Sequence, residues 1–134
     1  MILILFVCHE NANRSQIAEA FGNMYAPETV KVYSAGSTPS GIINPRAIQF
    51  MIELGYNLGK HSSKSVEQFP NVFFDYVVSM GCGDDCPIIS GKNHEDWQIP
   101  DPKNLSDSEY RIIRDYIGIK VKQLIDSVTR NQKQ

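Results

Sequence analysis

A cysteine and an arginine near the N-terminus have the spacing needed to bind and attack a tetrahedral oxyanion. The segment that contains them reads Cys8-His9-Glu10-Asn11-Ala12-Asn13-Arg14-Ser15. A loop of this length, C-x5-R-S, can wrap around one oxyanion with its backbone N–H groups pointing inward, so residues 9–14 form the candidate anion site. The planar guanidinium of Arg14 can bind two oxygens, and the positive surroundings favour a thiolate nucleophile at Cys8.

The alternative for this segment is a buried cysteine at the end of a strand, with Arg14 on a solvated helix turn. Three neighbouring features favour the anion site: the apolar run at residues 2–7, the serine that follows the arginine, and a helical pattern downstream.

Two further cysteines, Cys82 and Cys86, allow three interpretations. They could form part of a zinc site with His94, but the x3 spacing is unusual and a fourth ligand is lacking. They could also be small buried residues of a loop. The redox interpretation is favoured, because Gly81 and Gly83 allow the loop to move and two thiols can pass a disulfide outward by exchange.

A candidate proton donor, Asp101, lies in the segment Ile99-Pro100-Asp101-Pro102. Prolines on both sides can aim the carboxyl group into a pocket, where it could give a proton to a leaving oxygen. A turn aspartate is the ordinary alternative. The cysteine and arginine upstream favour the catalytic interpretation.

The elements that must position these residues alternate between strand and helix. Residues 2–7 are continuously apolar, which is typical of a parallel strand buried on both faces. Ser106 and Glu109 form a capping box at the start of the last helix, whose predicted apolar stripe includes Tyr116 and whose end is expected to fray from residue 131. The other expected elements are a helix at 14–25, a strand at 30–34, a helix from Asn44-Pro45 to Gly55, a strand at 75–80 and a weak strand at 97–99.

This order predicts an α/β fold with a parallel sheet and its active site at the carboxyl ends of the strands, where Cys8 and residues 80–82 would meet. The chain of 134 residues fits one domain over residues 1–134. A formal net charge of -2 gives no basic field for nucleic acid or membrane. The first apolar run is too short for a signal peptide or a span, and the three cysteines suggest a reducing cytoplasm.

The chain resembles the low-molecular-weight tyrosine phosphatase superfamily and, within it, the arsenate reductases. The motifs that carry the resemblance are V-C-x-x-N-x-x-R-S-Q-x-A-E at 7–19, Y-S-A-G at 33–36, N-P-x-A-I at 44–48, H-S-S at 61–63, C-G-D-x-C-P at 82–87, E-D-W at 95–97 and D-P at 101–102. The resemblance implies a three-layer fold: a four-stranded parallel sheet with helices on both faces. The second and third cysteines favour a reductase over a phosphatase.

The resemblance also implies roles for the site residues. Cys8 attacks arsenic, Arg14 and the loop amides hold the oxygens, and Asp101 protonates the departing hydroxide. Ser15 donates a hydrogen bond to the thiolate, and Asn11 holds the shape of the loop. In the thioredoxin-coupled branch, Cys82 then attacks Cys8, Cys86 resolves the Cys8–Cys82 disulfide, and thioredoxin reduces Cys82–Cys86.

Other activities remain open. Arsenate–small-thiol transferases of similar sequence use only the first cysteine, so Cys82 and Cys86 could be bystanders. A phosphotyrosine phosphatase would follow Asp-Pro with tyrosines, whereas Lys103 and Asn104 follow here. An inactive oxyanion-binding module is disfavoured by the intact catalytic set. Glu10 stands where many family loops have glycine, and its carboxylate must point outward to avoid repelling the anion.

The resemblance implies no resident metal or cofactor. Asn11, Glu19 and Ser34 match positions that bind potassium in some members, but Lys64 aligns with their additional aspartate, and its ammonium could take the place of the cation. The expected partners are an external reductant, either thioredoxin, glutaredoxin or a small thiol, and an arsenate-like or phosphate-like oxyanion. The protein is expected to act as a monomer.

Overall fold

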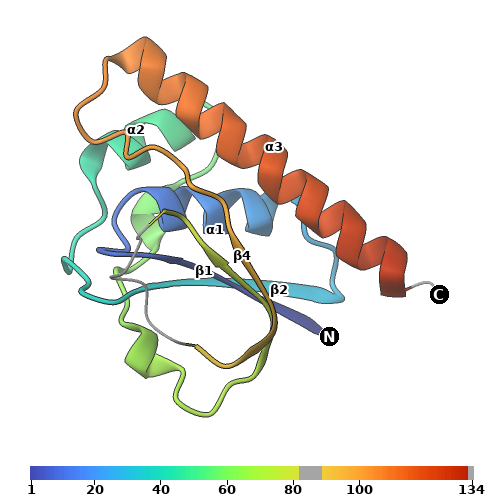
Figure 1. Cartoon of the computed structure of the whole chain (residues 1–134). Helices are drawn as coiled ribbons and strands as arrows, with labels where there is room; N and C mark the ends of the chain where they lie inside the picture. The colour runs from blue at the N-terminus through green and yellow to red at the C-terminus, as the bar shows by residue number, and fades with distance from the viewer. Residues whose placement is uncertain (82–88, 133–134) are drawn as a thin grey trace.

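A four-stranded parallel sheet in the order β2-β1-β3-β4 forms the centre of the structure (Figure 1). The structure is a computed structural model that describes residues 1–81 and 89–132. Cys8 pairs with Gly36, and Val7 pairs with Ser79, so the carboxyl ends of the three neighbouring strands lie together. The strands are β1 (Ile2–Cys8), β2 (Val30–Gly36), β3 (Phe74–Ser79) and β4 (Gly91–Asp96). The predicted parallel α/β sheet is confirmed.

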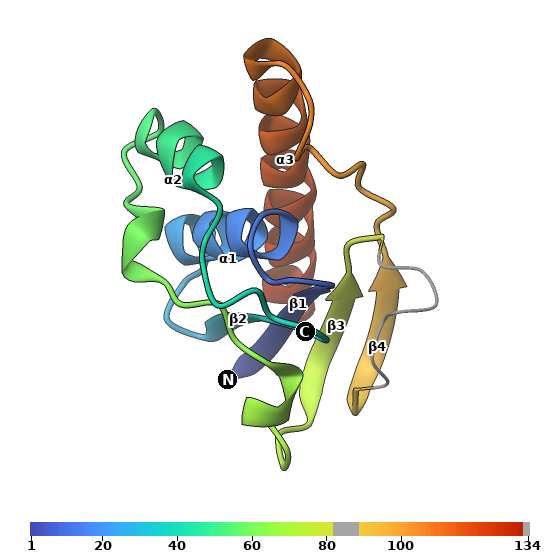
Figure 2. The same cartoon turned by 90° about the vertical axis from the view of Figure 1, so that its left-hand side faces the viewer.

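Helices lie on both faces of this sheet. In Figure 1 the three α-helices lie above the sheet and a short 3-10 helix lies below it. Figure 2 shows α1 against the sheet, with α2 and α3 packed beside it. The helices are α1 (Arg14–Tyr25), α2 (Pro45–Ile52), η1 (Leu58–Lys60), η2 (Val66–Gln68) and α3 (Asp107–Gln132). No helix in residues 1–81 and 89–132 is long and apolar enough to cross a membrane.

Strand β1 is buried on both faces, as its apolar sequence predicts. Ile4 and Phe6 belong to the core formed with α1, α2 and α3. Leu5 and Val7 point to the opposite face, where they join a smaller cluster against which Val66 of η2 packs. Successive side chains of a strand point to opposite faces, so a strand between two packed layers must be apolar throughout.

Local capping interactions define where α2 and α3 begin. The side chain of Asn44 accepts from Arg46 N at 2.9 Å, with Pro45 in the first turn. The predicted capping box is formed in part: Ser106 Oγ accepts from Glu109 N, and the Glu109 carboxylate turns back to accept from Ser106 Oγ.

The two helices are also joined by Glu53, the residue after α2. Arg111 and Arg114 of α3 donate to its carboxylate, and these hydrogen bonds lower the pKa of Glu53 to about 2. Helix α2 ends at Ile52, before the expected end at Gly55. Ile52 is 55% exposed because the chain leaves the core there.

The fourth strand is not at residues 97–99, where the sequence pattern predicted it. It is β4, six residues earlier in the chain, and it forms the edge of the sheet. An edge strand needs few apolar side chains, so the polar sequence GKNHED carries no strand signal. Trp97 and Ile99 are buried after β4, where Gln98 leaves the extended conformation at φ 41°.

The last helix differs from its prediction at two points. Tyr116, expected in the apolar stripe, is 44% exposed, while Tyr110 and most of Arg114 are buried. A stripe drawn on ideal spacing misses Arg114, because its guanidinium bonds to the Phe50 carbonyl and to Glu53. The helix also continues to Gln132, beyond the point where fraying was expected.

Gly36 at the end of β2 lies directly against the backbone of the anion-site loop. A Cβ atom there would be 2.7 Å from the carbonyl oxygen of His9 and 2.9 Å from Asn11 N. Gly36→Ala therefore has to push the loop backbone away. We expect a loss of about 1–3 kcal/mol in the free energy of unfolding, measured by urea denaturation, together with weaker binding of inorganic phosphate.

Gly59→Ala is the matched control for this substitution. Its Cβ would meet only a side-chain oxygen of Asn57 at 3.0 Å and more distant atoms. If both alanine variants had the same stability and phosphate affinity as the original protein, this result would contradict the close approach of Gly36 to the loop backbone.

Candidate oxyanion-binding active site

The loop after β1 forms the floor of a cavity of about 160 Å³. The cavity therefore has room for a tetrahedral oxyanion. The residues that line the cavity come from the loop and from the segment after β4: Cys8, His9, Glu10, Ala12, Asn13, Arg14, Asp101 and Lys103. The structure therefore brings the candidate nucleophile, anion ligand and proton donor to one place.

The loop turns its carbonyl groups outward. The carbonyl oxygens of His9, Glu10 and Ala12 accept from the backbone N–H groups of Thr38, Ser40 and Asn44, respectively. The carbonyl of Asn11 accepts from the side chain of Gln16. In a trans peptide the C=O and the next N–H point in opposite directions. Outward carbonyls therefore leave the N–H groups facing the cavity, where they can bind an anion.

Cys8 is nearly buried at the base of this loop, and its Sγ lies 2.8 Å from Ser15 Oγ. Asn11 Nδ2 donates to the same Ser15 oxygen at 2.8 Å. Because the serine oxygen already accepts from Asn11, its own proton is available for the sulfur. The Ser15 hydroxyl is thus placed to donate a hydrogen bond to the Cys8 sulfur.

Asn11 holds the loop in a conformation that few residues adopt. Its φ is 53° and its side chain is fully buried. The amide nitrogen donates to Ser15 and to Ser34, and the amide oxygen accepts from Gln16 Nε2 and from Lys64 N. Asparagine tolerates the left-handed region better than other non-glycine residues, and these four contacts offset the backbone strain.

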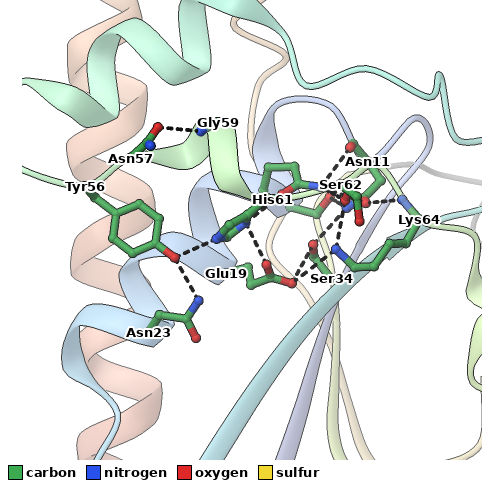
Figure 3. A network of polar contacts seen from close by, with 12 residues as sticks. Asn11, Glu19, Asn23, Ser34, Tyr56, Asn57, Gly59, His61, Ser62 and Lys64 are labelled. Atoms are coloured by element: carbon green, nitrogen blue, oxygen red, sulfur yellow. Dashed lines mark hydrogen bonds and ion pairs between the residues drawn. The ribbon is translucent and has the colours of Figure 1, made fainter.

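A buried carboxylate, Glu19 of α1, lies behind the loop (Figure 3). It accepts from Ser34 Oγ at 3.0 Å and contacts His61 Nδ1 at 2.7 Å and Lys64 Nζ at 3.6 Å. Burial alone would raise the pKa of Glu19, but the His61 hydrogen bond and the Lys64 charge together hold it below its ordinary value.

The ammonium of Lys64 offsets part of the negative charge of Glu19. Its ammonium also donates to the Ser62 carbonyl at 2.9 Å. Within residues 1–81 and 89–132, no group of three or more His, Cys, Asp and Glu side chains could hold a metal ion. The Lys64 ammonium, which belongs to the chain itself, is a positive charge next to Glu19.

Arg14 is anchored by two backbone carbonyls. Its Nη1 donates to the carbonyl oxygens of Met80 at 2.7 Å and Ile99 at 2.9 Å. These two contacts use one nitrogen and leave the rest of the guanidinium fork for an oxyanion. They also tie the loop after β1 to the end of β3 and to the segment that carries Asp101.

Asp101 is exposed at the rim of the cavity, and its Oδ1 accepts from Lys103 N at 3.0 Å. The next residues are held from α2, because Arg46 donates to the Pro102 and Lys103 carbonyls. One carboxylate oxygen thus orders the turn. Glu10 is also exposed and lines the cavity, so the outward orientation expected for its carboxylate stays a prediction.

Cys82 and Cys86 lie outside the described residues. The chain before them is close to the site, since Met80 O binds Arg14 and a Cβ on Gly81 would lie 3.3 Å from Arg14 Nη1. Gly81 has φ 87°, a conformation that favours glycine. His94, the third ligand of the zinc alternative, has its Nε2 2.9 Å from the Ile89 carbonyl.

Sequence reasoning missed several residues that support the site. His61 contacts Glu19 and Gln16, and Tyr56 OH lies 2.6 Å from His61 Nε2 (Figure 3). Tyr110 OH donates to Asn13 Oδ1 at 2.6 Å. Their partners are distant in sequence, so no local spacing reveals them. The only available signal was the H-S-S motif at residues 61–63.

Comparison with known proteins identifies the family of this chain. Residues 3–134 match the family described as low molecular weight phosphotyrosine protein phosphatase. The chain is 38% identical to arsenate reductase 2 of Staphylococcus saprophyticus over 128 residues, covering 92% of this chain and 96% of that protein. It is 33% identical to the glutaredoxin arsenate reductase of Synechocystis over 129 residues, covering 94% of this chain and 98% of that protein.

A solved structure described as an arsenate reductase in the phosphate binding state has the same fold. Its TM-score is 0.85 at 33% identity, covering 95% of this chain and 98% of that chain. The chain thus belongs to the low molecular weight phosphotyrosine protein phosphatase family, among relatives that are arsenate reductases.

Proposed function

We propose that the protein is an arsenate reductase that uses Cys8 as nucleophile and a relay through Cys82 and Cys86. The observation that carries the proposal is the loop itself: its carbonyls point outward, and its two ends hold a buried thiol and an anchored guanidinium. The relatives support the reaction, since they are named arsenate reductases over nearly the whole chain.

The first step forms a covalent arsenic–sulfur bond. Arg14 and the loop amides hold the arsenate oxygens while the Cys8 thiolate attacks arsenic. A hydroxide leaves, and Asp101 at the cavity rim gives it a proton to form water. Arsenic is still in the pentavalent state at this point.

Reduction occurs in the second step. The Cys82 thiolate attacks the Cys8 sulfur, the sulfur–arsenic bond breaks, and its electron pair goes to arsenic, which leaves as arsenite. Cys86 then attacks Cys82, which frees Cys8. An external dithiol such as thioredoxin or glutaredoxin reduces the Cys82–Cys86 disulfide.

Phosphotyrosine hydrolysis is the second candidate, because the same loop can hold a phosphate group. None of the described residues that line the cavity is Phe, Tyr or Trp, and Lys103 stands at its rim. A small cavity with a charged rim suits an inorganic oxyanion better than an aromatic ester. A third candidate is a transferase in which a small thiol attacks the Cys8 adduct directly.

Single-turnover arsenate reduction distinguishes these candidates. We expect Cys8→Ser to abolish both arsenite formation and release of phosphate from an aryl phosphate, because a hydroxyl cannot replace the thiolate. Cys82→Ser should stop thioredoxin-coupled turnover and keep aryl phosphate hydrolysis, which needs only the loop and Asp101. Cys86→Ser should accumulate a Cys8–Cys82 disulfide, detected by mass spectrometry.

The double variant Cys82→Ser, Cys86→Ser is the control for the relay. Full multiple-turnover reduction by this variant with a small thiol would contradict the relay and support direct thiol transfer. Phosphate release without any arsenite formation by the original protein would support the phosphatase instead.

Arg14→Lys tests whether the geometry of the guanidinium matters beyond its charge. A lysine has three N–H donors in place of the guanidinium fork, so it cannot bind the carbonyls of Met80 and Ile99 and also two oxygens of an oxyanion. We expect kcat/KM for arsenate to fall at least about a hundredfold, or roughly 3 kcal/mol. A change of less than about threefold would show that the anchored guanidinium does not bind substrate.

Lys64→Met tests the internal cation beside Glu19. Removing the ammonium leaves a buried carboxylate with only His61 and Ser34, so we expect a loss of about 1–3 kcal/mol in the free energy of unfolding at pH 7. The lowered pKa of Glu19 stabilises the fold above about pH 4.5, its ordinary value. That contribution disappears as the pH falls, so the two proteins should become more similar in acid.

Urea denaturation at pH 7 and pH 4 measures this effect, with the exposed Lys31→Met as the matched control. Replacing sodium chloride with potassium chloride should leave the stability of the original protein unchanged. A marked stabilisation by potassium would contradict the role assigned to Lys64.

A further inference from the structure

Asn13, the residue before α1, does not cap the helix that it precedes. Asparagine at this position normally accepts from an N–H group of the first helical turn through its side-chain oxygen. Asn44, Asn57 and Ser65 do so at the starts of α2, η1 and η2. Asn13 makes no such bond and has φ −127° and ψ −87°. It is the exception, and it lies in the candidate active site.

The side chain of Asn13 is instead held by Tyr110 of α3. Tyr110 OH donates to Asn13 Oδ1 at 2.6 Å, across 97 positions of sequence. The ring is fully buried, with its centroid 4.7 Å from that of Phe50 and the Arg46 guanidinium 4.8 Å away. Burial raises the pKa of the Tyr110 hydroxyl, so it stays protonated and acts as a donor.

This contact affects the end of the helix that faces the anion cavity. The first N–H groups of an α-helix have no partner within the helix and carry partial positive charge. Asn13 and Arg14 line the cavity, and the first turn of α1 contains no acidic side chain. An asparagine oxygen that capped α1 would accept from Ser15 N or Gln16 N and would place partial negative charge beside the cavity, which weakens the attraction of the helix N-terminus for an anion.

We propose that Tyr110 is a positioning residue of the oxyanion site, which holds the Asn13 amide oxygen away from α1 and so keeps the positive potential of the helix N-terminus undiminished at the anion. The inference rests on the oxyanion loop of the proposed function. It assigns to a residue of the last helix a role in anion affinity, in addition to its place in the core. The helix forgoes a stabilising cap in favour of binding.

Two substitutions at Asn13 separate this role from a structural one. Both Asn13→Ser and Asn13→Ala lose the long amide that meets Tyr110, but serine can cap α1 and alanine cannot. We expect the serine variant to be the more stable in thermal unfolding and yet to bind inorganic phosphate about fivefold more weakly than the alanine variant, as measured by calorimetry.

Tyr110→Phe tests the other side of the contact. Without the hydroxyl, Asn13 is free to cap α1, so phosphate affinity should fall about fivefold. Adding Asn13→Ala to this variant should restore part of the affinity, because alanine has no acceptor. Tyr116→Phe, an exposed tyrosine on the same helix, is the control and should bind phosphate like the original protein.

The outcomes are distinct. Equal phosphate affinity of the serine and alanine variants, or no recovery in the Tyr110→Phe, Asn13→Ala double variant, would overturn the inference while leaving the oxyanion site in place. Failure of the original protein to bind phosphate would overturn the proposed function and the inference together. The comparison of Asn13→Ser with Asn13→Ala tests the inference even if Tyr110→Phe does not fold.

Discussion

The side-chain amide of Asn11 is fully buried, and all of its hydrogen-bonding capacity joins the loop after β1 to its surroundings. It contacts α1 through Ser15 and Gln16, and β2 through Ser34. It also contacts the segment between η1 and η2 through Lys64 N. A buried amide that lost these partners would be costly, so the φ of 53° at Asn11 and the shape of the loop are fixed together. The outward carbonyls and the contact between Ser15 and Cys8 depend on that shape.

A second layer of charge supports this amide. Ser34 joins Asn11 to the buried Glu19, which is balanced by His61 and Lys64. Dipoles and charges that are fixed before substrate arrives need not reorganise during reaction, which is the main source of electrostatic catalysis. The loop and the charges behind it are therefore arranged to hold a tetrahedral oxyanion.

Much of this organisation could be predicted from local sequence. The apolar run of β1, the C-x5-R-S segment, the Asn44 cap and the capping box at Ser106 each depend on residues a few positions apart. Strand β4 could not be predicted, because an edge strand is held by its backbone pairing and needs no apolar pattern. The pairs His61 with Glu19 and Tyr110 with Asn13 were also missed, since only the folded chain brings them together.

The most direct test of the account is a crystal structure with bound inorganic phosphate. The account predicts one phosphate in the cavity above Cys8, bound by the N–H groups of residues 9–14 and by Arg14, while Arg14 Nη1 keeps its contacts with the Met80 and Ile99 carbonyls. A phosphate bound elsewhere, or an Arg14 side chain that leaves those carbonyls, would contradict the assignment of this cavity and of the anchored Arg14 to oxyanion binding.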